Sequence, residues 1–156
     1  MPDLSLDDFR AEATAFLDAN AELRDTDQRF VWGEGDDDLA LFEEVDPEAE
    51  KRQLAEAKAW RAKRFDAGFG YLSGPAQYGG RELPAAYDRA YAQLEAKYAI
   101  PDQSFFGIGL GMVAPTILAH ATDVVKEAYL AKMYRGDLVG AQLFSEPGAG
   151  SDLAGP

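Results

Sequence analysis

Apolar residues recur at the spacing of one helix face near the start of the chain. They are Phe9, Ala13, Phe16 and Leu17. Ser5 stands just before them and is a good N-cap residue, and the two aspartates that follow it suit the positive end of a helix dipole. The pattern predicts an amphipathic helix that begins after Ser5.

A second helix is predicted between Asp46 and Gly68. Pro47 suits the first helical position, because the N–H that proline lacks has no partner there. The residues on its inward face are Leu54, Ala57, Arg61 and Phe65. Residues 25–46, which precede this helix, are acidic, contain two glycines and have no clean periodicity, so we expect them to form a long loop.

Glycine and proline interrupt any regular pattern in residues 68–84, which we expect to form an irregular loop. Pro84 then opens a helix with aromatic and aliphatic residues at i, i+4, i+7 and i+11. These are Tyr87, Tyr91, Leu94 and Tyr98. An aromatic stripe of this kind is typical of a protein core, so we expect core packing rather than a ligand contact.

The most apolar stretch covers residues 105–121. It is shorter than the roughly 20 residues of a membrane span and contains three glycines and Pro115. We therefore expect a buried helix pair, broken near Pro115, and no membrane span. Its glycines, Gly107, Gly109 and Gly111, permit the close approach of another backbone or of a flat ligand. His120, near its end, is expected to be a structural residue.

The last helix is predicted to be capped by Thr122 and to end at Gly136. Val125, Tyr129 and Met133 share one stripe of it. Residues 137–145 then have the character of a β-strand, followed by a tight turn rich in proline and glycine. A lone strand leaves backbone groups unpaired, so we expect its partners beyond residue 156.

The fold predicted from these patterns is all-α, a bundle of about six helices over residues 1–136. Residues 137–156 are expected to be the incomplete start of a β-domain. The chain carries 28 acidic and 15 basic residues, a formal charge of −13, which argues against nucleic acid as a partner. The absence of cysteine and the single histidine argue against disulfides, thiol nucleophiles and metal sites. The acidic start does not resemble a secretory signal, so a cytoplasmic location is expected.

Residues 144–152, FSEPGAGSD, closely resemble the signature of acyl-CoA dehydrogenases. Two further segments support the resemblance. Residues 76–84, AQYGGRELP, resemble the family's loop between N-terminal helices, and residues 117–137 resemble the segment that leads into the signature. The resemblance implies an all-helical N-terminal domain, a middle β-domain that begins near the signature, and a C-terminal helical domain.

The resemblance also implies FAD as the cofactor. The implied cofactor-binding residues are Gln142, Leu143, Phe144, Ser145, Gly150 and Ser151. The hydroxyl of Ser145 would bond near flavin N5, and Ser151 would also reach the acyl-CoA substrate. Leu143 and Phe144 depart from the small and aliphatic residues usual before the signature Ser or Thr, and Glu146 is structural in the family.

The activity implied is α,β-desaturation of acyl-CoA thioesters, by abstraction of the α-proton and transfer of the β-hydride to FAD. The base that takes the proton belongs to the family's C-terminal domain, so no catalytic residue is expected in this chain, and the chain alone is expected to be inactive. Part of residues 105–121 would face the fatty-acyl chain or the flavin domain. The complete enzyme would form a homo-oligomer, a dimer or tetramer, and pass electrons to an electron-transfer flavoprotein.

Two alternatives remain at this point. One is a helical interaction module that kept the fold and lost catalysis. The other is an acyl-CoA or nitroalkane oxidase, since both kinds of oxidase share the scaffold and use oxygen as the acceptor.

Overall fold

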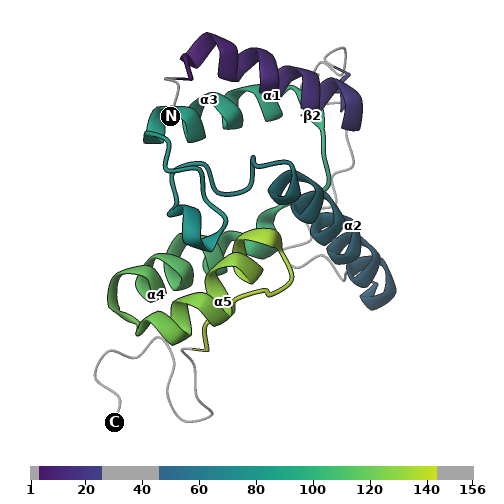
Figure 1. Cartoon of the computed structure of the whole chain (residues 1–156). Coiled ribbons are helices and arrows are strands. Elements are labelled where there is room, and N and C mark those ends of the chain that lie inside the picture. The colour runs from purple at the N-terminus through teal and green to yellow at the C-terminus, as the bar shows by residue number, and fades with distance from the viewer. Residues whose placement is uncertain (1–3, 26–45, 144–156) are drawn as a thin grey trace, which may run out of the picture.

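The computed structural model describes residues 4–25 and 46–143, and within these ranges it is mostly helical (Figure 1). The α-helices are α1 (Leu6–Asn20), α2 (Pro47–Asp66), α3 (Ala85–Glu95), α4 (Ala114–His120) and α5 (Asp123–Arg135). Short helical turns are η1 (Ala76–Tyr78), η2 (Ser104–Phe106) and the π-helical η3 (Gly109–Val113). The all-α prediction is confirmed. Almost all of the predicted loop over residues 25–46 lies outside the described residues.

The predicted starts of the first two helices are confirmed by their caps. The Oγ of Ser5 accepts a hydrogen bond from the backbone N–H of Asp8 at 3.1 Å. Asp46 does the same for the N–H of Glu48 at 3.2 Å, one residue before Pro47 opens α2. Each side chain satisfies one of the donors that a helix start leaves without an intrahelical partner.

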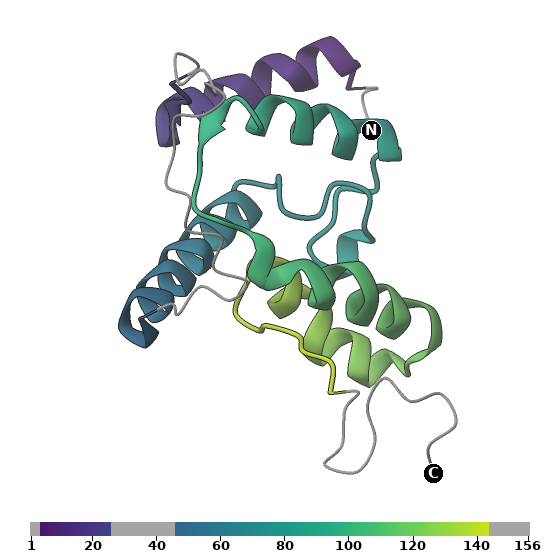
Figure 2. The same cartoon turned by 180° about the vertical axis from the view of Figure 1, so that it is seen from behind.

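The helices form two pairs, one at each end of the molecule. Helices α1 and α3 lie side by side at one end, α4 and α5 lie side by side at the other, and α2 runs between them (Figures 1 and 2). The core at the first end includes Phe9, Leu17, Trp60, Phe69 and Tyr91. The rings of Phe69 and Tyr91 stack with centroids 5.3 Å apart, so the aromatic stripe of α3 belongs to the core as predicted.

Tyr98 is buried as expected, but its placement on the helix was wrong. Helix α3 ends at Glu95, and Tyr98 lies in the two-residue strand β2 (Tyr98–Ala99), antiparallel to β1 (Glu22–Leu23). The Nε of Arg24 donates to the carbonyl oxygen of Tyr98 at 2.8 Å. The strand forms because its pairing partner follows α1, far away in the sequence.

Residues 104–120 form one helical run rather than a pair broken near Pro115. The run passes from η2 through a π segment, where the N–H of Ala114 bonds the carbonyl of Gly109, into α4. Proline lacks an N–H and crowds the carbonyl four residues earlier, and the wider π turn before Pro115 accommodates both effects. The prediction of burial was also too broad. Phe106, Gly109 and Ala114 are buried, but much of the opposite side is exposed.

Helix α5 follows Thr122 and ends at Gly136, as predicted. Gly136 has a φ of +91°, the left-handed conformation that ends many helices. The predicted cap by the Thr122 side chain was wrong, because that side chain makes no capping hydrogen bond. Residues 137–143 contain no paired strand, and residues 144 and 145 of the predicted strand lie outside the described residues. Among the described helices, none is long and apolar enough to cross a membrane.

Candidate cofactor and substrate face

The segment that leaves α5 crosses the helical run at a contact between two glycine backbones. A Cβ atom added to Gly140 would lie 2.7 Å from the Cα of Gly109, and one added to Gly109 would lie 3.0 Å from the nitrogen of Gly140. Side chains at these positions would therefore collide with backbone. The crossing lies two residues before Gln142, the first residue of the predicted cofactor segment.

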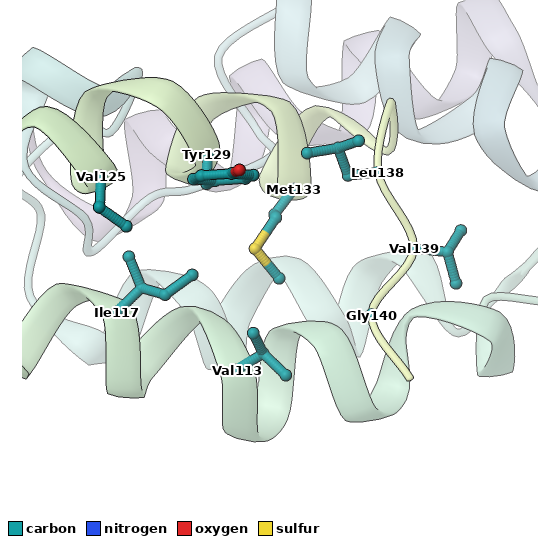
Figure 3. Close-up of a pocket in the computed structure, with 8 residues that line it drawn as sticks. All are labelled: Val113, Ile117, Val125, Tyr129, Met133, Leu138, Val139 and Gly140. Carbon is teal, nitrogen blue, oxygen red and sulfur yellow. The ribbon is translucent and has the colours of Figure 1, made fainter. Parts of the chain in front are cut away.

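An apolar pocket of about 330 Å³ lies beside this crossing, between α5, the helical run and the crossing segment (Figure 3). Its lining residues are Val113, Ile117, Val125, Tyr129, Met133, Leu138, Val139 and Gly140. Met133 extends from α5 toward Val113 on the facing helix (Figure 3). The predicted stripe of α5 therefore serves as a pocket wall. Met133 is buried in the core, whereas Tyr129 is 48% exposed.

The helical run also carries an exposed apolar stripe, which consists of Gly107, Ile108, Gly111 and Met112. Ile108 is 42% exposed and Met112 is 49% exposed. A Cβ atom added to Gly107 or Gly111 would meet no heavy atom within 4 Å. Glycine inside a helix costs roughly 1 kcal/mol relative to alanine, and no neighbour among the described residues requires it at these two positions. The stripe therefore has the character of a surface that a close-fitting apolar group approaches.

Comparison with protein families decides the identity. The model of the acyl-CoA dehydrogenase N-terminal domain matches residues 18–137. The chain belongs to the acyl-CoA dehydrogenase family. The resemblance first noted in the signature thus extends through the helical domain that precedes it.

Curated acyl-CoA dehydrogenases share this part of the sequence. Acyl-CoA dehydrogenase IpdE1 of Mycobacterium tuberculosis is 34% identical over 109 residues, which cover 69% of this chain and 28% of the relative. The protein of the same name in Mycolicibacterium smegmatis is 33% identical over 109 residues, which cover 69% of this chain and 27% of the relative. Acyl-CoA dehydrogenase FadE34 of Mycobacterium tuberculosis is 39% identical over 105 residues, which cover 67% of this chain and 13% of the relative. The chain thus spans less than a third of these relatives. No solved structure matched.

Of the six predicted cofactor residues in this acyl-CoA dehydrogenase chain, the structure describes two. Gln142 is half-buried, and Leu143 is 95% exposed. Phe144, Ser145, Gly150 and Ser151 lie outside the described residues, as does Glu146. A flavin ring has apolar faces and a polar edge. An amide that can donate and accept, followed by a free aliphatic side chain, fits such a group.

The start of the helical run is held to α2 by a buried arginine. The guanidinium carbon of Arg61 lies 5.0 Å from the ring centroid of Phe106, and its Nη1 donates to Oε1 of Gln103 at 3.3 Å. Burial, reinforced by the nearby charge of Arg64, lowers the pKa of Arg61 to about 10. Nε of Arg61 has no hydrogen-bond partner among the described residues. Arg61 thus faces the buried side of the run, away from the exposed stripe.

The sequence pattern did not identify two of the features that build this face. Gly140 gave no signal beyond being a glycine between apolar residues, and its partner Gly109 is 31 positions away. The sequence pattern also did not show that Ile108 and Met112 are exposed, because residues 105–121 are almost all apolar and no polar face marks the outward side. His120 is exposed and is the last residue of α4.

Proposed function

We propose that the chain is the N-terminal part of an FAD-dependent acyl-CoA dehydrogenase. Such an enzyme desaturates acyl-CoA thioesters at the α and β carbons, and FAD supplies the acceptor for the β-hydride when it is bound. The observation that carries the proposal is that the segment leading to the signature crosses the same helical run that carries the exposed apolar stripe. A surface for an acyl chain and the contact that holds the start of a flavin-contacting segment therefore belong to one helical run.

The exposed stripe would contact the acyl chain. Ile108 and Met112 offer apolar surface, and Gly107 and Gly111 let an alkyl chain approach the backbone closely. Each methylene removed from water on such a surface contributes about 0.8 kcal/mol to binding. An uncharged acyl group is the ligand that these side chains favour.

The signature segment would hold the cofactor through a few polar atoms. In this proposal Ser145 donates a hydrogen bond near flavin N5, and Ser151 reaches both the cofactor and the acyl-CoA. Gln142, Leu143, Phe144 and Gly150 line the same segment. We assign no catalytic base to this chain, because the family's proton-abstracting carboxylate belongs to the C-terminal domain.

The remaining features of the complete protein follow from the family. We infer that the helical domain ends at Gly136, where the left-handed cap terminates α5, and that residues 137–156 open the β-domain. Transfer of electrons to an electron-transfer flavoprotein, a homo-oligomeric state and a cytoplasmic location are part of the same proposal.

The proposal is tested with the complete protein that contains this chain. Purified protein should retain FAD, and saturated acyl-CoA added without oxygen should bleach the oxidised flavin band with formation of the 2-enoyl-CoA. Absence of bound FAD, together with cooperative unfolding that added FAD does not shift, would support the non-catalytic module instead. Hydrogen peroxide formed in stoichiometric amounts in air would support an oxidase.

The chain itself offers a matched test of the cofactor segment. Ser145→Ala should lower the rate of flavin reduction by acyl-CoA, because it removes the hydrogen bond near N5. Ser104→Ala is the control, since Ser104 is exposed and its hydroxyl bonds only Asp102 among the described residues. Equal rates of flavin reduction in the two variants would contradict the role of Ser145.

A further inference from the structure

The backbones of Gly109 and Gly140 approach more closely than any side chain would permit. An alanine at residue 140 would place its Cβ 2.7 Å from the Cα of Gly109, whereas ordinary contact begins at 3.4 Å. The two backbones would have to separate by about 0.7 Å, the difference between these distances. The obstacle is backbone, which cannot rotate away as the end of a side chain can.

Neither glycine is required by its own backbone conformation. The described glycines with positive φ are Gly68, Gly79 and Gly136, so Gly109 and Gly140 adopt angles that other residues also adopt. Close approach is therefore the reason for glycine at both positions. Apolar atoms complete the contact, since the Cγ2 of Val113 lies 3.5 Å from the added Cβ of Gly140 and the Cε of Met133 lies 3.6 Å from that of Gly109.

The contact joins the helical run that carries the exposed stripe to the segment that leads into the cofactor residues. Gly109 opens the π segment of the helical run, between Ile108 and Met112 of the exposed stripe. Gly140 stands two residues before Gln142, and a residue spans at most about 3.5 Å, so little chain is available to absorb a displacement. A shift at the crossing is therefore passed on to the cofactor segment.

We propose that Gly109 and Gly140 are positioning residues, whose backbone contact sets the distance between the acyl-facing stripe and the flavin-contacting segment. The inference rests on the proposed function for its consequence in catalysis, but its geometric part concerns this chain alone. The two parts are tested separately.

The geometric part is tested by nuclear magnetic resonance on this chain of 156 residues. The sequence contains no cysteine, so a paramagnetic label on the exposed Thr116→Cys variant is unique. The label broadens the amide signals of Gln142 and Leu143, and this broadening falls steeply with the distance between the label and each amide. Gly140→Ala should weaken this broadening and Gly140→Val should weaken it further. Gly111→Ala should leave it unchanged, because a Cβ atom added there meets no atom within 4 Å beyond its chain neighbours and its own helix backbone.

Unchanged broadening in Gly140→Val would overturn the proposal. If a substitution at residue 140 prevents folding, Gly109→Ala approaches the same contact from the other side with a milder overlap, 3.0 Å instead of 2.7 Å. The double variant should weaken the effect less than the sum of the single changes, because the first alanine already separates the backbones. Additive changes would show that the two glycines do not act through one contact.

The catalytic part uses the complete protein. Gly140→Ala should shift the absorption bands of the bound flavin and lower kcat with little change in KM, by an amount approaching the roughly 100-fold that a 1 Å misplacement can cost. A lower melting temperature with an unchanged flavin spectrum and kcat would reduce the contact to a structural role. If the unsubstituted protein holds no FAD, the proposed function fails, and the resonance measurement still decides the geometric part.

Discussion

Trp60 of α2 donates its indole N–H to a carboxylate oxygen of Glu95, at the end of α3, across 3.0 Å. Arg64, one turn further along α2, donates to the other oxygen of the same carboxylate at 3.0 Å. Both carboxylate oxygens of Glu95 thus accept hydrogen bonds from groups on one face of α2. This network ties α2 to the α1 and α3 pair, since Trp60 also belongs to the aromatic core there.

Glu95→Gln should destabilise the fold by about 2–4 kcal/mol, because it leaves the charge of Arg64 without its ionic partner in a largely buried place. The side chains of this pair are only 17% and 11% exposed. Urea unfolding followed by tryptophan fluorescence measures the change. The control is Glu12→Gln, which removes the more exposed pair with Arg81 and should cost less than about 1 kcal/mol. Similar losses in the two variants would contradict the special role of Glu95.

Two helix starts with similar residues should respond differently to alanine. Ser5→Ala should cost about 1 kcal/mol, because Ser5 accepts a hydrogen bond from the N–H of Asp8. Thr122→Ala should cost less, because the Thr122 side chain makes no capping hydrogen bond. Thermal unfolding monitored by circular dichroism at 222 nm compares them. A larger loss at Thr122 would mean that the side chain caps α5 in solution.

Asp66 should make stability depend on pH in the acid range. Two hydrogen bonds from Arg135, at 2.8 Å and 2.9 Å, hold the pKa of Asp66 below its usual value of 3.8. Because the folded pKa is the lower one, the stabilisation is fully present above pH 3.8 and is lost as the pH falls through the folded value. Asp66→Asn should therefore lower the melting temperature at about pH 7 and have little effect at about pH 2.

Asp18→Asn is a suitable comparison for that experiment, because Asp18 accepts a hydrogen bond from Tyr98 and has no ion pair among those described. The difference in melting temperature between wild type and Asp66→Asn should become smaller as the pH is lowered. A difference that grows toward low pH would contradict the assignment.

A substitution in the exposed stripe should change the acyl-chain preference of the complete protein without lowering the stability of the fold. Gly111→Leu should leave the melting temperature unchanged or raise it, because the position is open and leucine favours a helix over glycine by up to about 1 kcal/mol. In the complete protein, the same change should shift kcat/KM toward shorter acyl-CoA substrates. Measurement over a series of acyl-chain lengths tests this.

Gly109→Leu provides the contrast, although it lies on the same helical run. The position is buried against Gly140 and Met133, so leucine there should prevent folding or sharply lower the melting temperature. If Gly111→Leu left the chain-length preference unchanged, the stripe would not face the acyl group.

Much of the fold could be predicted because helix ends depend on local chemistry. Ser5, Pro47 and Gly136 each act within a few residues of their own position, as a cap acceptor, a residue without an N–H and a left-handed terminator. The period of Phe9, Ala13 and Leu17 likewise identified the buried side of α1. These signals are contained in short windows of sequence.

The candidate site could be predicted only as a motif. The family was identified from the sequence, and the roles of the signature residues stay a prediction. The exposed side of residues 105–121 was not identified, because a uniformly apolar segment has no polar face to reveal its orientation. The burial of Arg61 also followed its place in the helical period, whereas its position over Phe106 did not.

The sequence by itself determined where α1, α2, α3 and α5 begin, where α2 and α5 end, which residues of α1 and α3 enter the core, and the family to which the chain belongs. Only the tertiary structure decided that Tyr98 pairs as a strand with Leu23, that the helical run continues through Pro115, and that Gly109 touches Gly140. The physical reason is the range of the interactions. Caps and periodicity act between neighbours along the chain, whereas strand pairing and backbone crossings join residues far apart in sequence and leave no periodic trace there.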